Sequence, residues 1–175
     1  MEWMKSLRSR NVFGAFALMI GDNIVSAASS IAPDAGPTAA ALALLDHEPG
    51  LSIRMLSAGV GLSHAGTVRL VDRLVSEGLV ERRGHATDGR TKSLYLTAAG
   101  RKASAAVLNA RDKVIAQALA TLSADELATL NSLSEKVLRS CLRDVDHAYH
   151  ICRLCGYGYC KDCPIEAELH QREVI

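Results

Sequence analysis

Four cysteines near the C-terminus have the spacing of a metal site. Cys152, Cys155, Cys160 and Cys163 form two C-x-x-C pairs, and Pro164 follows the last of them. Each pair lets two thiolates converge from one tight turn, so two pairs can complete a tetrahedron around zinc. A disulfide framework would spread its cysteines along the chain to tie distant segments together. The cluster therefore predicts one four-thiolate metal centre per chain, in a reducing compartment.

The cysteine spacing favours zinc and leaves an iron–sulfur cluster open. It resembles a compact zinc knuckle, in which four thiolates suffice without His147 or His150. A final cysteine before proline also occurs in runs that bind a [4Fe-4S] cluster, although the other spacings differ. Disulfides or redox-active free thiols are the alternative to a metal. The fifth cysteine, Cys141, lies on an apolar helical stripe and is predicted to pack in the core.

A second group of residues suits contact with DNA. The stretch from Glu81 to Lys102 contains six basic and two acidic residues, a net +4 in a chain whose total is +1. Upstream, small or polar residues open a predicted helix, on which Ala65, Arg69 and Arg73 share one face. Such a helix end fits a major groove, and a basic hairpin tip can reach the minor groove. The predicted DNA contacts are Ser63, His64, Ala65, Thr67, Arg69, Arg73, Arg83, Arg90 and Lys92.

Periodicity and capping signals predict the elements that position these residues. The first part of the chain should form helices over 11–31, 37–47, 53–60 and 63–76, then a hairpin with strands at 79–83 and 90–97. Thr97 is expected to cap a long helix, and Ser123 with Glu126 forms a capping box that begins the next one. The apolar stripe of that last helix continues to Ala148, and helical periodicity ends near His150.

The order helix, glycine turn, helix and hairpin is that of a winged helix-turn-helix, and the sequence resembles the MarR (multiple antibiotic resistance regulator) family over about residues 37–143. The segment 63–82 is similar to the recognition helix and first wing strand of that family. Asp88-Gly89-Arg90 resembles its Asp-x-Arg wing motif, and the segment 96–100, Leu-Thr-Ala-Ala-Gly, resembles its Leu-Thr-x-x-Gly junction. Each motif alone is common, but together they are specific.

The resemblance implies a homodimeric DNA-binding regulator, usually a repressor. The first helix and the last two would interleave with a second copy, and each lobe would bind half of a pseudo-palindromic operator. Arg90 would reach the minor groove, and Asp88 would support the wing by pairing with an arginine such as Arg73. His64 departs from the small polar residue expected at its position. A small-molecule effector would bind between the dimerisation region and the DNA-binding lobes.

The expected fold is mainly α-helical with a small β-hairpin wing. Residues 1–36 and 98–149 should form a helical dimerisation region, 37–97 the DNA-binding lobe and 150–175 a metal-binding tail. With 49% apolar residues and a net charge near zero, the chain is not disordered. It lacks a glycine-rich phosphate loop and a convincing nucleophile–base arrangement, so we do not expect an enzyme.

Two further expectations concern location and rival functions. The sequence has no uninterrupted apolar stretch of about 18 residues, which predicts no membrane span. Basic residues before the apolar run 12–20 resemble a signal peptide, but Asp22 and Asn23 interrupt it, which favours an amphipathic helix in a cytoplasmic protein. The rivals to a regulator are an iron–sulfur redox sensor or electron-transfer protein on a winged-helix scaffold, and a protein-interaction module.

Overall fold

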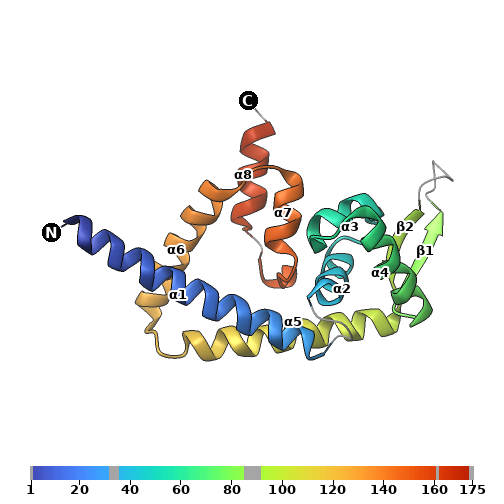
Figure 1. Ribbon diagram of the computed structural model, residues 1–175, viewed down its shortest axis with the longest axis horizontal. Coiled ribbons are helices and arrows are strands. Elements are labelled where there is room, and N and C mark those ends of the chain that lie inside the picture. Colours follow the sequence, from blue (N-terminus) through green and yellow to red (C-terminus); the bar gives the residue numbers. More distant parts are fainter. Residues whose placement is uncertain (1, 32–35, 85–91, 161, 174–175) are drawn as a thin grey trace.

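The computed structural model describes residues 2–31, 36–84, 92–160 and 162–173 (Figure 1). The elements follow the order helix, three more helices, hairpin and four further helices, with one short 3-10 turn. Their bounds are α1 Glu2–Ser29, α2 Pro37–His47, α3 Ile53–Val60, α4 His64–Ser76, β1 Val80–Gly84, β2 Lys92–Leu96, α5 Ala98–Leu119, α6 Ala124–Cys141, α7 Val145–Cys152, η1 Tyr157–Tyr159 and α8 Pro164–Glu173.

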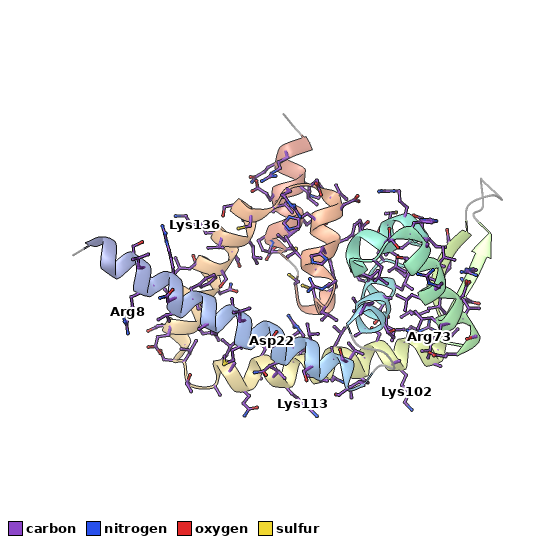
Figure 2. The ribbon with its side chains drawn as sticks, in the orientation of Figure 1. Arg8, Asp22, Arg73, Lys102, Lys113 and Lys136 are labelled. Atoms are coloured by element: carbon purple, nitrogen blue, oxygen red, sulfur yellow. The ribbon has the colours of Figure 1, made fainter. Side chains whose placement is uncertain are left out.

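The two long helices α1 and α5 form one layer, and two groups of shorter elements lie against it. In Figure 1, α1 and α5 lie side by side. The lobe that contains α2, α3, α4 and the hairpin lies at one end of this layer, and α6, α7 and α8 fold back above it. Exposed charged side chains such as Arg8, Lys102 and Lys113 project outward from α1 and α5 (Figure 2). The predicted mainly helical fold with a β-hairpin is confirmed.

The lobe is built around an aliphatic core. Leu42, Leu56, Leu74 and Leu94 come from four different elements, and each is completely buried. The strands β1 and β2 pair antiparallel, and the backbone N–H of Leu94 also donates to the carbonyl of Leu51. The loop before α3 is thereby tied to the hairpin. This core fixes the wing and the two central helices as one unit.

Capping residues begin the helices at the predicted positions. The hydroxyls of Ser52 and Ser63 accept bonds from the backbone of α3 and α4. Between these helices Gly61 has a φ of 70°, a left-handed conformation that favours glycine and gives the sharp change of direction. Ser123 and Glu126 form both bonds of the predicted capping box.

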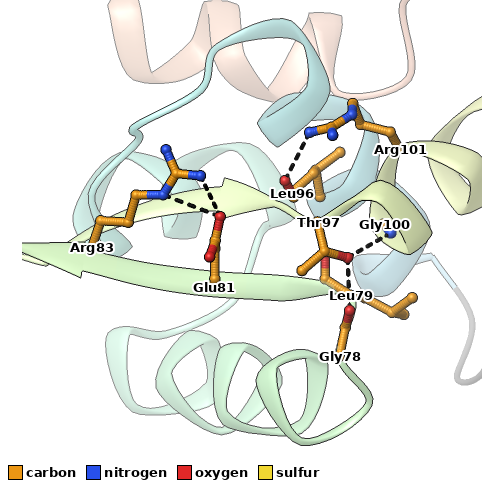
Figure 3. Close-up of polar contacts among 8 residues, drawn as sticks. All are labelled: Gly78, Leu79, Glu81, Arg83, Leu96, Thr97, Gly100 and Arg101. Carbon is orange, nitrogen blue, oxygen red and sulfur yellow. Dashed lines mark hydrogen bonds and ion pairs between the residues drawn. The ribbon is translucent and has the colours of Figure 1, made fainter.

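The junction between the hairpin and α5 depends on a close backbone approach (Figure 3). The Thr97 hydroxyl accepts a bond from the N–H of Gly100 at 3.0 Å and itself lies 2.7 Å from the carbonyl oxygen of Gly78. A Cβ on Gly100 would lie 2.0 Å from the carbonyl oxygen of Leu79. Any side chain at position 100 would therefore push the base of the wing away from α5.

The C-terminal part differs from the expectation of one long helix. Helix α6 ends at Cys141, and Leu142 turns into a small core with Ala148 and three residues of the cysteine region. Asp144 caps a new helix by accepting a bond from the N–H of His147 at 2.7 Å. The prediction that the stripe continues in one helix to Ala148 is therefore wrong, because Asp144 offers the backbone a new start.

A tail unit, which we define as residues 142–173, results from this break. It includes α7, which spans the predicted tail boundary at residue 150 and packs against α3 of the lobe. It also includes the helix α8, where the sequence suggested no helical periodicity. From α8 the guanidinium of Arg172 donates to the carbonyl oxygen of Leu142 at 2.9 Å, which stabilises the chain where α6 ends.

Helices α1 and α6 leave much apolar surface uncovered. In the part of the chain that the structure describes, α6 has no buried residue, and Cys141 is exposed rather than packed in a core as predicted. On α1, Phe13 and Leu18 are 61% and 69% exposed. By length and composition alone, the stretch Ser6–Ser29 could also cross a membrane.

Candidate nucleic-acid interface and metal centre

The N-terminal end of α4 presents the predicted recognition face. Ser63, His64, Ala65 and Arg69 are all exposed there. The Ser63 hydroxyl is occupied as the helix cap, accepting from the N–H of Gly66 at 3.2 Å. The positive end of the helix dipole and the small Ala65 side chain leave this end accessible to a phosphate backbone and a groove.

Two of the predicted contact residues are instead built into the lobe. Thr67 is completely buried, and its hydroxyl donates to the carbonyl oxygen of Ser63 at 3.1 Å. Arg73 is half-buried and donates to the hydroxyl of Thr38 at 2.7 Å, while its guanidinium lies 3.7 Å from the carboxylate of Glu77. Both side chains therefore hold α4 in place, and direct contact with a base is left to the exposed residues.

The wing is fastened to the recognition helix by an ion pair that the sequence analysis did not identify. Arg82 of β1 donates to the carboxylate of Asp72 on α4 at 2.7 Å, so the first wing strand and α4 share a fixed spacing. A signal existed: two exposed side chains of opposite charge lie ten residues apart in the sequence. Linking such a pair requires knowing the angle between strand and helix.

The predicted contact residue Arg83 lies on the exposed side of the wing. Its guanidinium pairs with Glu81 on the same strand (Figure 3) and lies 4.5 Å above the ring of Tyr95 on the neighbouring strand. It remains exposed, so a phosphate can compete for it with Glu81. Asp88 and Arg90 lie outside the described residues, as does the side chain of Lys92.

The four clustered cysteines come together in the core of the tail unit. Cys152 ends α7 and Cys163 precedes α8; both are buried, and the other two lie between them. The thiols interact within each C-x-x-C pair, Cys152 with Cys155 and Cys160 with Cys163. Among the described residues, no group of three or more cysteine, histidine or acidic side chains is arranged to hold a metal ion. The soft, closely grouped donor set fits zinc or an iron–sulfur cluster.

The surroundings stabilise one thiolate and disfavour others. The hydrogen bond from Cys152 and the positive charge of Arg111 on α5 lower the pKa of Cys155 to about 7, although burial opposes them. The same hydrogen bond and burial raise the pKa of Cys152. Burial and the neighbouring Cys163 raise the pKa of Cys160 to about 11. Several thiolates in one small core repel each other, and a bound cation removes that repulsion.

The tail unit is docked on the DNA-binding lobe through α7. The Tyr149 hydroxyl donates to the carboxylate of Glu48 at 2.9 Å, and Asp146 pairs with Arg54 on α3. The ring of His47 stacks on Tyr157, the residue two places after Cys155. The cysteine region thus contacts α2 through Tyr157, and α7 contacts α3, the first helix of the helix-turn-helix. Sequence reasoning missed this contact because the bonded residues are about a hundred positions apart.

A glycine turn between two helices, followed by an antiparallel wing fixed to the second helix, defines a winged helix-turn-helix, a DNA-binding fold. Residues 35–91 match the MarR family, so the resemblance seen in the sequence is confirmed for this part of the chain. No curated protein matches the chain.

Several solved structures share this fold. The YusO protein from Bacillus subtilis is 20% identical with a TM-score of 0.61, over 78% of this chain and 98% of that one. The reduced form of MarR from E. coli is 25% identical with a TM-score of 0.60, over 71% and 95%. MepR, a transcription regulator of the Staphylococcus aureus multidrug efflux pump MepA, is 18% identical with a TM-score of 0.62, over 75% and 96%.

Proposed function

We propose that the protein is a homodimeric, cytoplasmic transcriptional repressor that binds a pseudo-palindromic operator and has no catalytic activity. The observation that carries this proposal is the exposed N-terminal face of α4 next to a wing fixed by the Arg82–Asp72 ion pair. In this proposal Ser63, His64 and Arg69 face the major groove. Arg83, Arg90 and Lys92 extend the contact along the wing, and bound protein covers the promoter.

The uncovered apolar surface supports a dimer. Phe13 and Leu18 on α1, and Leu133 and Val137 on α6, are between 47% and 69% exposed in one chain. Exposed apolar area of this kind is costly in water and typical of an interface between copies. In a dimer, α1 and α6 would both face the partner. This would explain both the apolar character of α1 and the exposure of Cys141, the last residue of α6.

Operator selection from random DNA tests the proposal directly. We expect an enriched sequence with two inverted half-sites, one per protomer. Arg69→Ala should lower affinity about 10-fold or more and relax specificity at one position of each half-site. Arg90→Ala should weaken binding to all sequences and reduce the salt dependence. Failure to enrich any sequence, with a folded dimer, would contradict the proposed function.

The dimer has its own test. Leu133→Asp should convert the protein to monomers in analytical ultracentrifugation, because it would bury an unpaired charge in the interface. Arg139→Asp is a matched control on the same helix, at a half-buried position that lies outside this apolar stripe. A dimer that persists in Leu133→Asp would mean that α6 does not form the interface.

We further propose that Cys152, Cys155, Cys160 and Cys163 bind one metal centre, with zinc favoured over a [4Fe-4S] cluster. The centre would supply folding energy to the tail unit by neutralising thiolates that otherwise repel each other. Tyr157 lies close enough to Cys152 for a hydrogen bond and can orient that sulfur. The position of Arg111 beside Cys155 offsets the excess negative charge of a four-thiolate site.

A redox sensor is the second candidate, favoured by the contact between the tail unit and α3. Loss of an iron–sulfur cluster would unfold the tail and release the lobe that contains the recognition helix. Metal analysis and absorption spectroscopy of anaerobically purified protein separate the two. Zinc gives a colourless protein, whereas a cluster absorbs near ~400 nm and is brown. Protein with neither metal in stoichiometric amount would contradict both assignments.

A further inference from the structure

A cavity of about 280 Å³ lies where the tail unit meets the DNA-binding lobe. Leu44 of α2 forms one side, and Val145, Ile165 and Leu169 of α7 and α8 form the other. Its size is close to the lower end of small-molecule sites. Helices α7 and α8 lie outside residues 35–91, so the cavity is made partly by the segment that does not match the family.

The polar groups around the cavity have one sign of charge. Glu48 of the lobe and Glu166 of α8 both line it, and the charges of both act on His47. None of the described residues that line the cavity is Lys or Arg. His47 also lines it, and burial lowers the pKa of His47 although both carboxylates act against that shift. The ring is therefore largely neutral at pH 7 and does not offset the negative charge.

The aromatic groups add a surface suited to a cation. The rings of His47 and Tyr157 stack and line the cavity together, and the Tyr149 hydroxyl donates to Glu48. Aromatic faces attract cations, most strongly where water is excluded. An apolar frame would contact the aliphatic residues, and a positive group would lie between the two carboxylates.

We propose that this cavity binds a small organic cation, an amine on an aromatic or aliphatic frame. Such a ligand would bridge Glu48 of the lobe and Glu166 of the tail, whose negative charges otherwise repel each other. Binding would therefore favour the docked arrangement of the tail unit. That this ligand acts as an effector rests on the proposed regulatory function, but its binding does not.

The test uses three probes of similar shape and different charge, measured by calorimetry on the full-length protein without DNA. The probes are 2-phenylethylammonium, neutral 2-phenylethanol and anionic 3-phenylpropionate. We expect the cation to bind about 10-fold more tightly than the neutral probe, the difference that one partly desolvated ion pair provides. The anion should bind most weakly.

Three variants locate the site. Glu166→Gln should lower the affinity for the cation about 5-fold to 10-fold and leave the neutral probe unchanged. Asp46→Asn is the matched control, because it also removes one negative charge. Asp46 is an exposed residue of α2 that does not line the cavity. Val145→Phe should fill the cavity and weaken binding of both the cation and the neutral probe, at a position that is 46% exposed and tolerant of substitution.

Equal affinity for the cation and the neutral probe would overturn the proposal, as would equal effects of Glu166→Gln and Asp46→Asn. Because binding is measured without DNA, failure here leaves the operator experiment untouched. Cation binding that does not change operator affinity would support the site and refute its role as an effector site.

Discussion

The DNA-binding lobe and the tail unit are stabilised in different ways. The lobe buries leucines and valines from every one of its helices and strands. The tail unit is about thirty residues long, and five of its described residues form a buried core, of which two are the thiols Cys152 and Cys163. Units shorter than ~40 residues usually need a metal or a disulfide to fold. We therefore expect the aliphatic core to stabilise the lobe without help, whereas the tail unit should depend on its cysteines.

Removing a thiol should give the largest difference between the two regions. In Cys163→Ser we expect bound metal to fall from about one per chain to near zero, because one ligand is lost from a four-thiolate site. The tail unit should become sensitive to protease while the lobe stays protected. Metal analysis and limited proteolysis with mass spectrometry measure both effects.

Cys141→Ser is the control, since this thiol is exposed on α6 and is not part of the cluster. It should keep the metal and the protected tail. If the Cys163→Ser protein kept its full metal content, the proposed metal site at the four cysteines would be wrong. A lobe that unfolds together with the tail would show that the two regions are not independent.

The second prediction concerns a substitution that should destabilise the lobe and leave the tail unit unchanged. Gly100→Ala places a Cβ 2.0 Å from the carbonyl oxygen of Leu79, which forces the wing base to shift. We expect a loss of about 2–3 kcal/mol in the free energy of unfolding of the lobe, with metal content unchanged. Urea denaturation followed by circular dichroism measures it.

Gly21→Ala is the matched variant, another helical glycine with no atom within 4 Å of the added Cβ. There the better helix propensity of alanine should stabilise by about 0.5–1 kcal/mol. Equal effects at the two positions would show that the approach of Leu79 to position 100 is not what constrains the wing.

The third prediction concerns the joint between the regions. Tyr149→Phe removes the hydrogen bond to Glu48 and should weaken docking of α7 by about 1 kcal/mol. Hydrogen exchange of the α7 amides reports this as reduced protection. In a double-mutant cycle with Glu48→Gln the two changes should not be additive, because they share one bond. Additive effects would mean that the bond does not hold the tail.

The smallest expected effect is that of pH on the docking of the tail unit on the lobe. Burial lowers the pKa of both His47 and His150 in the docked state. When the tail unit is undocked, these two histidines bind protons more readily than when it is docked. Docking is therefore complete above the ordinary histidine pKa of about 6.5 and weakens as the pH falls below it. The carboxylates of Glu48 and Glu166 act against this shift at His47, whereas Arg143, His147 and Arg153 add to it at His150.

Protection of the α7 amides should accordingly fall between about pH 6.5 and 5. The double variant His47→Gln, His150→Gln should flatten this dependence. Amide protection that rises on acidification, or that the double variant leaves unchanged, would place the pH response elsewhere.

Most local structure was predictable because its causes are local. Ser52, Ser63 and Thr97 cap helices at the positions where the sequence places them, and Gly61 makes the turn between α3 and α4. The recognition face of α4 follows from helical periodicity, although the same periodicity did not reveal that Thr67 is buried. The break after Cys141 was missed because Asp144 lies within an apolar stripe that continues on both sides.

The order of helices and strands, the basic wing segment and the two C-x-x-C pairs follow from the sequence, since caps, turns and C-x-x-C spacing act over a few residues. The ion pair of Arg82 with Asp72, the bond from Arg73 to Thr38 and the docking of α7 on α3 depend on the tertiary structure. These contacts join residues from different elements, and their energies depend on angles and distances that no local pattern specifies. The cavity between Glu48 and Glu166 exists for the same reason: two segments more than a hundred residues apart meet there.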